Sequence, residues 1–173
     1  WTGTTSTDPT VAGNWNPAAV PCSGANEVIP SGLTNYPVYT NLTIDAGTTL
    51  TVNTGGRLTV TGTLTNNGTM TIESGATFLQ GPSSSIATGT TGTFNVKQAV
   101  TGAGGSTPTG RFWYMGLPIN NLTRGTAFGT ASGANRLWSW SESAQAWSSQ
   151  ITDATTLTPT TGYVFRTGSD VTL

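Results

Sequence analysis

Apolar side chains return at a regular spacing through the middle of this chain. The steps are eight residues long, apart from one step of twelve that contains Leu64, and the positions are Leu42, Leu50, Leu58, Met70, Phe78, Ile86 and Phe94. Around each position the chain alternates, as in Leu50, Thr51 and Val52, so apolar side chains point to one side of a strand and threonines to the other. The pattern predicts a series of short strands, each with one buried face and one threonine face.

Glycine and asparagine separate these strands and supply the positive φ angles that sharp corners need. Units this short form either the hairpins of an antiparallel meander or the sides of a parallel β-helix whose coil takes two or three of them. Sustained repetition favours a parallel β-helix (β-solenoid) over residues 41–100, because each coil buries its apolar side against the next. The sequence Asn66-Asn67-Gly68 suits a coil corner but also a hairpin turn, so the meander stays open as an alternative.

Residues 1–40 have a different character, because five prolines interrupt any long strand there. We expect this segment to be an extended N-terminal cap or arm. Trp1, Trp15 and the apolar pair Val28-Ile29 are the side chains that we expect to cover the open end of the solenoid, whose bare edge would otherwise pair with other chains.

The composition changes again after Val100, where the sequence TGAGGSTPTG is typical of a linker. Four of the six tryptophans follow it. The segment RFWYMGLPI (111–119) predicts a strand, RLWSWSESAQAW (136–147) a hairpin that turns near residues 142–144, and TGYVFRTG (161–168) another strand. We therefore expect residues 101–173 to form a small β-sandwich-like module in an all-β protein.

Charge is scarce, which excludes several classes of partner. Charged residues make up 8% of the chain, the net charge is -1, and no basic block is present. A nucleic-acid groove and an anionic membrane surface are therefore not expected, and no apolar stretch of 18 residues predicts membrane insertion. Cys22 is the single cysteine, so no internal disulfide is expected, and a small half-buried residue is a better interpretation than a reactive thiol. The first residue, Trp1, suggests a processed exported protein or a piece of a longer one.

The order of five segments resembles the large secreted surface proteins of Bacteroidota, many of which are exported by the type IX pathway. These segments are WTGTTSTDPTVAGNWNPAAVP, NLTIDAGTTLTVNTGGRLTVTGTLTNNGTMTIESGATF, RFWYMGLPI, RLWSWSESAQAW and LTPTTGYVFR. The resemblance implies β-helical stalk modules joined to sandwich modules, a secreted, extracellular or cell-surface location, and a role in adhesion or surface structure. It brings no catalytic residues.

The sequence contains few residues that could carry out catalysis. The chain has no histidine, which removes the commonest general base and imidazole metal sites, and its seven acidic residues are scattered. A polysaccharide-degrading enzyme would need Asp45, Glu73 and Arg57 to gather in one groove. No calcium-loop motif is present, and we expect no catalytic residue, no metal site and no cofactor.

Tryptophan gives the clearest candidates for a functional surface. As an assembly or ligand surface we single out Trp1, Trp15, Trp113, Trp138, Trp140 and Trp147. An indole exposed on a sheet stacks against sugar rings, and Trp138 and Trp140 share one face of their strand. The competing interpretation is that these side chains, with Trp113, Tyr163 and Phe165, form the core of the second module or a contact with a neighbour. In RFWYM, either Phe112 and Tyr114 or Trp113 and Met115 are expected to stay exposed.

Two functional hypotheses follow. The first is a structural protein that builds an extracellular filament or surface layer from its own copies, since repeated heterologous contacts generate a fibre unless they close into a ring. The second is a cell-surface carbohydrate-binding or adhesin module that uses the C-terminal tryptophans. Exposure of Trp138 and Trp140 separates them: coplanar, solvent-facing rings favour glycan binding, and burial in a core or between subunits favours assembly.

Overall fold

The computed structural model describes residues 1–21, 24–102 and 111–173. Almost all regular structure is β, and the chain divides into two compact units, Trp1–Lys97 and Gln98–Leu173, which are described one at a time. Cys22 and most of the predicted linker lie outside the described residues. No helix in the described part of the chain has the length and apolar character needed to cross a membrane.

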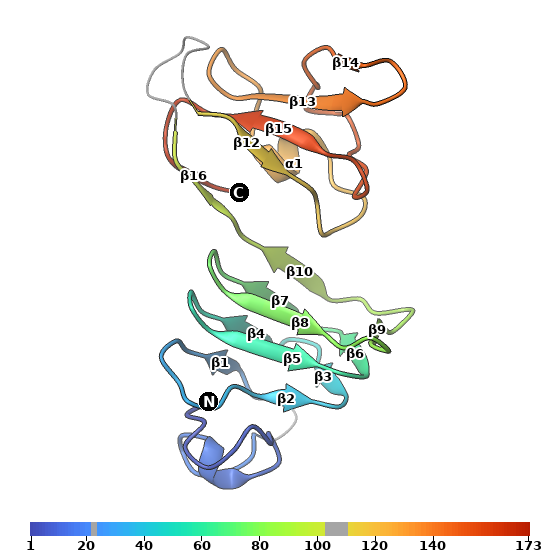
Figure 1. The fold of residues 1–173 in the computed structure, drawn as a ribbon. Helices are drawn as coiled ribbons and strands as arrows, with labels where there is room; N and C mark the ends of the chain where they lie inside the picture. Colours follow the sequence, from blue (N-terminus) through green and yellow to red (C-terminus); the bar gives the residue numbers. More distant parts are fainter. Residues whose placement is uncertain (22–23, 103–110) are drawn as a thin grey trace. The chain divides into compact units, whose positions relative to one another are not determined.

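The N-terminal unit is a parallel β-solenoid with three sheets, which confirms the β-helix and shows that the antiparallel meander was wrong (Figure 1). The chain visits the sheets in turn. The first sheet contains β1 (Glu27–Ile29), β4 (Thr49–Val52), β7 (Thr69–Ile72) and β10 (Thr93–Val96); the second contains β2 (Val38–Tyr39), β5 (Arg57–Val60) and β8 (Thr77–Gln80); the third contains β3 (Leu42–Ile44), β6 (Thr63–Asn66) and β9 (Ser85–Ile86). A coil therefore takes three strands.

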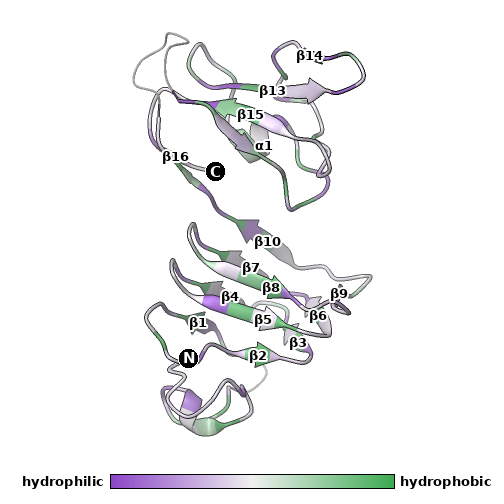
Figure 2. Ribbon diagram, in the orientation of Figure 1, coloured by the Kyte–Doolittle hydropathy of each residue, from purple (hydrophilic) through white to green (hydrophobic). Residues whose placement is uncertain are grey.

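Apolar residues of successive coils stack on one another through the solenoid. Leu50 pairs with Met70, Leu42 with Leu64, and Leu58 with the half-buried Phe78. Leu64, the residue inside the twelve-residue step, occupies the third side of its coil. The alternation predicted from the sequence appears in the burial of β5, where Leu58 and Val60 are buried and Arg57 and Thr59 are not, and the hydropathy colour changes along this strand (Figure 2). Burial of this apolar column at roughly 25 cal/mol per Å² is the main force that holds the coils together.

Glycines with positive φ shape one corner of successive coils. Gly55 has a φ of +76° and Gly75 a φ of +78°, a conformation that side chains with a Cβ rarely adopt. The Gly55 amide donates to the carbonyl oxygen of Gly75 at 3.0 Å, so the two corners are also hydrogen bonded to each other. The corner geometry repeats because the same residue type returns at the same place in the coil.

The N-terminal segment packs on the first coil through its two tryptophans. The rings of Trp1 and Trp15 meet edge to face, with centroids 5.0 Å apart, and both belong to the buried cluster that contains Ile29. This segment holds a single 3₁₀ turn, η1 (Ala12–Asn14). The first coil begins at Glu27, inside the range 1–40 that the sequence assigned to the cap, because β1 and β2 pair with solenoid strands although they are only three and two residues long.

The C-terminal unit is built from antiparallel sheets and one short helix. Its larger sheet has the order β12 (Trp113–Met115), β15 (Tyr163–Arg166), β13 (Arg136–Ser141) and β14 (Ala146–Trp147), and a second sheet pairs β11 (Ala99–Val100) with β16 (Val171–Thr172). The predicted hairpin is confirmed, since Ser141 pairs with Ala146 across the turn. The helix α1 (Arg124–Phe128) lies against one face of the larger sheet (Figure 1), and its Phe128 packs at 5.0 Å from the ring of Phe165.

Candidate functional site

The larger sheet of the C-terminal unit has a core face and an outer face, and its strand register assigns residues to each. Leu137 and Phe165 pair with each other and belong to the buried core. Side chains alternate along a strand, so the next residues, Trp138 and Val164, point to the outer face. Tyr114 pairs with Val164 and therefore shares that face.

Aromatic rings cover this outer face and stay exposed to solvent. Tyr114 is 77% exposed, Trp147 49% and Trp140 36%. Trp138 is half-buried, with its ring centroid 6.4 Å from that of Phe112. The structure thus resolves the alternative within RFWYM in favour of Phe112 and Tyr114 as the exposed pair, which are 42% and 77% exposed.

Trp140 and Trp147 form one wall of a pocket of about 470 Å³ on this sheet. They sit opposite each other on β13 and β14, with ring centroids 5.1 Å apart and ring planes inclined by 64°. Tyr114 lines the pocket as well, and so do Gly116 and Gly162. A Cβ built on Gly162 would meet no atom within 4 Å, so the missing side chain leaves open space there.

Three side-chain donors at this pocket have no hydrogen-bond partner among the residues that the structure describes. In the described part of the chain, the indole N–H groups of Trp1, Trp15 and Trp113 donate to main-chain carbonyl oxygens at 2.8 to 3.0 Å. Among the same residues, no hydrogen bond satisfies the indole N–H of Trp140 or Trp147 or the hydroxyl of Tyr114. The pocket therefore combines apolar walls with a few free donors, the usual composition of a small-molecule site.

Three of the six predicted tryptophans do not belong to this surface. Trp1 and Trp15 are only 9% and 7% exposed because they fill the end of the solenoid core, as expected of the cap, and they leave little surface for assembly or a ligand. Trp113 is half-buried against the core of the C-terminal unit and donates to the carbonyl oxygen of Thr101. Trp138, Trp140 and Trp147 remain. The two glycines carried no signal in the sequence, since only strand pairing places them beside the tryptophans.

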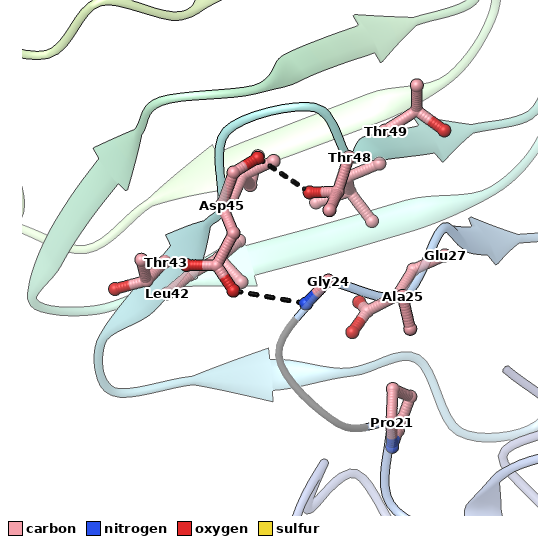
Figure 3. Close-up of a pocket in the computed structure, with 11 residues that line it drawn as sticks. Pro21, Gly24, Ala25, Glu27, Leu42, Thr43, Asp45, Thr48 and Thr49 are labelled. Atoms are coloured by element: carbon pink, nitrogen blue, oxygen red, sulfur yellow. Dashed lines mark hydrogen bonds between the residues drawn. The ribbon is translucent and has the colours of Figure 1, made fainter.

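A smaller cleft of about 130 Å³ lies beside the first coil of the solenoid (Figure 3). Two carboxyl groups line it, those of Glu27 and Asp45. Asp45 accepts a hydrogen bond from the Gly24 amide at 3.2 Å. Burial raises the pKa of Glu27, and the hydroxyl of Tyr39, which donates to Glu27 Oε2 at 3.2 Å, offsets part of that rise.

This cleft does not contain the groove that a polysaccharide-degrading enzyme would need. Glu73 follows β7 and binds Lys97 at 2.7 Å, and Arg57 begins β5 with its guanidinium 5.6 Å from the ring centroid of Tyr36. Neither residue lines the cleft beside Asp45. Within residues 1–21, 24–102 and 111–173, no group of three or more potential metal ligands comes together.

Comparison with known protein families identifies one match. A family model described as Domain of unknown function (DUF8693) matches residues 1–173. The chain belongs to this family. No curated protein and no solved structure matches it. The description of DUF8693 names no function.

Proposed function

We propose that the protein is a non-catalytic, extracellular module that binds carbohydrate at the cell surface, with the solenoid as its stem. The observation that carries this proposal is the pocket lined by Trp140, Trp147 and Tyr114. A pyranose ring has an apolar face of C–H groups that stacks on an indole, while its hydroxyl groups hydrogen bond to donors at the rim. Exposed rings with unpartnered N–H groups provide both kinds of contact.

The charges of the C-terminal unit support binding rather than hydrolysis. Glycosidases use two carboxyl groups that face each other across the sugar, about 5 to 10 Å apart. Of the described acids of this unit, Asp153 pairs with Arg124, Asp170 accepts from the Gly102 amide, and Glu142 lies in the hairpin turn. None of the three lines the pocket.

The experiment that tests this proposal is a glycan array followed by calorimetric titration of the best ligand. Trp140→Ala and Trp147→Ala are each expected to weaken binding about tenfold or more, since the loss of one stacking ring costs on the order of 1–3 kcal/mol by analogy with base–aromatic stacking. Leu79→Ala is the control, because Leu79 is equally exposed at 43% but lies on the solenoid. Equal binding by all three variants, or no glycan bound by the parent chain, contradicts the proposal.

A second function, self-assembly into a filament, is favoured by the last coil of the solenoid. Within the described residues, β8, β9 and β10 each pair with one strand only. Ile86 pairs with the buried Leu64, and Val96 with the buried Ile72, yet Ile86 and Val96 are themselves exposed. The apolar column of the solenoid therefore ends in exposed side chains on strands with one free edge, and a free strand edge can accept further strands.

Negative-stain electron microscopy over a concentration series tests self-assembly. Fibres of uniform width are expected at high concentration, and Val96→Lys is expected to suppress them, because a charge at that place would be buried in the contact. The control is Val38→Lys, because Val38 is also exposed but lies on β2 in the first coil. Single particles at every concentration would rule out assembly by this chain alone.

A further inference from the structure

We propose that the pocket holds one neutral pyranose residue at the end of a glycan chain and does not bind the flat face of a packed polysaccharide. This inference rests on the proposed carbohydrate-binding function and specifies the ligand of the same site. Three features of the pocket support it: the angle between its rings, its glycine floor and the absence of charge among its lining residues.

The ring angle excludes a flat ligand. The planes of Trp140 and Trp147 are inclined by 64°, and their centroids are 5.1 Å apart. A crystalline polysaccharide offers a plane of sugar rings, and it contacts two indoles face to face only when those indoles lie in one plane. Rings that meet at this angle form a corner. A corner receives a single sugar ring that stacks on one indole and contacts the edge of the other.

The glycine floor of the pocket leaves space for that sugar ring. Gly116 and Gly162 adjoin Met115 and Tyr163, which pair with each other at the end of β12 and β15. Any larger residue at these two places would raise the floor toward the level of Tyr114. The resulting volume of about 470 Å³ is within the range of small-ligand pockets, which is roughly 300–1,000 Å³.

The chemistry of the lining favours an uncharged sugar. The seven residues that line the pocket are Tyr114, Met115, Gly116, Trp140, Trp147, Gly162 and Tyr163, and none of them carries a charge at neutral pH. The free indole N–H groups and the Tyr114 hydroxyl donate to sugar hydroxyl oxygens. Tyr163 contributes no donor, because its hydroxyl already donates to the Thr158 carbonyl oxygen and accepts from the Thr158 amide. A uronate would find no cation among the lining residues.

The deciding variant is Gly162→Val, which fills the pocket and leaves every aromatic side chain in place. Its matched control is Gly133→Val, in the same unit, because a Cβ built on Gly133 also meets nothing within 4 Å. The probes are neutral hexasaccharides of glucose, xylose, mannose and N-acetylglucosamine, together with microcrystalline cellulose and chitin. Circular dichroism checks that each variant folds, and Gly116→Ala and Gly162→Ala serve as milder fillers if Gly162→Val does not fold.

The expected result is one bound hexasaccharide per chain, at least tenfold weaker binding after Gly162→Val, and unchanged binding after Gly133→Val. Partial hydrolysis of the matching polysaccharide should raise the binding per unit mass, since hydrolysis creates chain ends. The chain-end pocket is overturned, and the proposed function left intact, if binding survives Gly162→Val and both milder fillers but is lost in Trp140→Ala. Preference for the crystalline polymers has the same meaning. If Trp140→Ala and Trp147→Ala keep the binding and the specificity of the parent chain, or if the chain dimerises through this face, both the chain-end pocket and the proposed function are overturned.

Discussion

Asn66 is the single polar residue that points into the solenoid interior along β3, β4, β5, β6 and β7. It is fully buried and pairs in register with Ile44, so asparagines do not form a ladder here. Instead its Nδ2 donates to the Thr93 carbonyl oxygen of the next coil at 2.9 Å, and its Oδ1 accepts from the Gly68 amide at 3.2 Å. The side chain satisfies main-chain groups at a corner, which explains a buried amide in an apolar column.

At the residue scale, Glu27→Gln is expected to stabilise the solenoid at neutral pH. Burial raises the pKa of Glu27 above its ordinary value of 4.5, although the Tyr39 hydroxyl and the Trp1 ammonium oppose the rise. The folded state therefore binds the proton more tightly than the unfolded state. Stability from this group is fully present below pH 4.5 and is lost as the pH rises through the raised pKa.

Urea unfolding of the parent and of Glu27→Gln between pH 4 and pH 8 measures this effect. The difference in the free energy of unfolding, variant minus parent, should grow with pH over the lower part of that range and then level off. A difference that stays constant or falls with pH would show that ionisation of Glu27 is not disfavoured in the folded protein.

At the scale of elements, helix α1 depends on one buried arginine. Arg124 is fully buried, and its guanidinium donates to Asp153 at 2.7 Å, to the carbonyl oxygen of Asn135 at 2.9 Å and to the carbonyl oxygen of Gly129. The helix itself has five residues and a cap in which the Thr126 amide donates to the Thr123 hydroxyl. A helix this short is not stable alone in water, so tertiary contacts hold it.

Arg124→Met is accordingly expected to destabilise the C-terminal unit by about 2–3 kcal/mol, because it removes the charge-assisted hydrogen bonds of a buried guanidinium to two main-chain carbonyl oxygens. Asp153 adds little to this cost, since its side chain is 41% exposed and regains water. The measurement is chemical unfolding followed by tryptophan fluorescence. Arg111→Met is the control, because Arg111 is exposed and its guanidinium carbon lies 5.6 Å from the ring centroid of Trp113. Similar losses in the two variants would contradict the role given to Arg124.

Strands were predictable from the sequence because their signal is local. The alternation of Leu50, Thr51 and Val52 already specifies an extended chain with one buried face, and the hairpin that turns near residues 142–144 follows from the mainly polar run between Trp140 and Trp147. The helix was not predictable, since RGTAF has no apolar periodicity and the helix is held by contacts of Arg124 with residues outside it, such as Asn135.

The candidate site was predictable only in part. Trp138 and Trp140 were found because both are large, aromatic and on one face of a strand, and Trp1 and Trp15 pack on the end of the solenoid as the cap prediction expected. The pocket depends on Gly116 and Gly162, whose importance comes from lacking a side chain at a place that strand pairing defines. No local pattern encodes that arrangement.

At the scale of the whole molecule, each unit has a hydrophobic core of its own. Every residue of one buried cluster lies within Trp1–Lys97, and every residue of the other within Gln98–Leu173. Residues 1–97 produced alone are therefore expected to fold and to unfold cooperatively on heating, as seen by far-ultraviolet circular dichroism. Residues 1–48, which end after the first coil, should stay unfolded, because a single coil has no neighbour to bury its apolar side. An unfolded 1–97 fragment would contradict this division.

The strand register of the solenoid also bears on how its length can change. Leu50 and Met70 hold equivalent places twenty residues apart, and Met70 and Phe94 hold them at a longer interval, so the corners absorb extra residues while the paired strands keep their alignment. Gain or loss of one complete coil would leave every remaining neighbour matched, whereas gain or loss of a fraction of a coil would turn the apolar column outward. In evolution, the reach of such a stem is adjustable only in whole increments of about 4.8 Å.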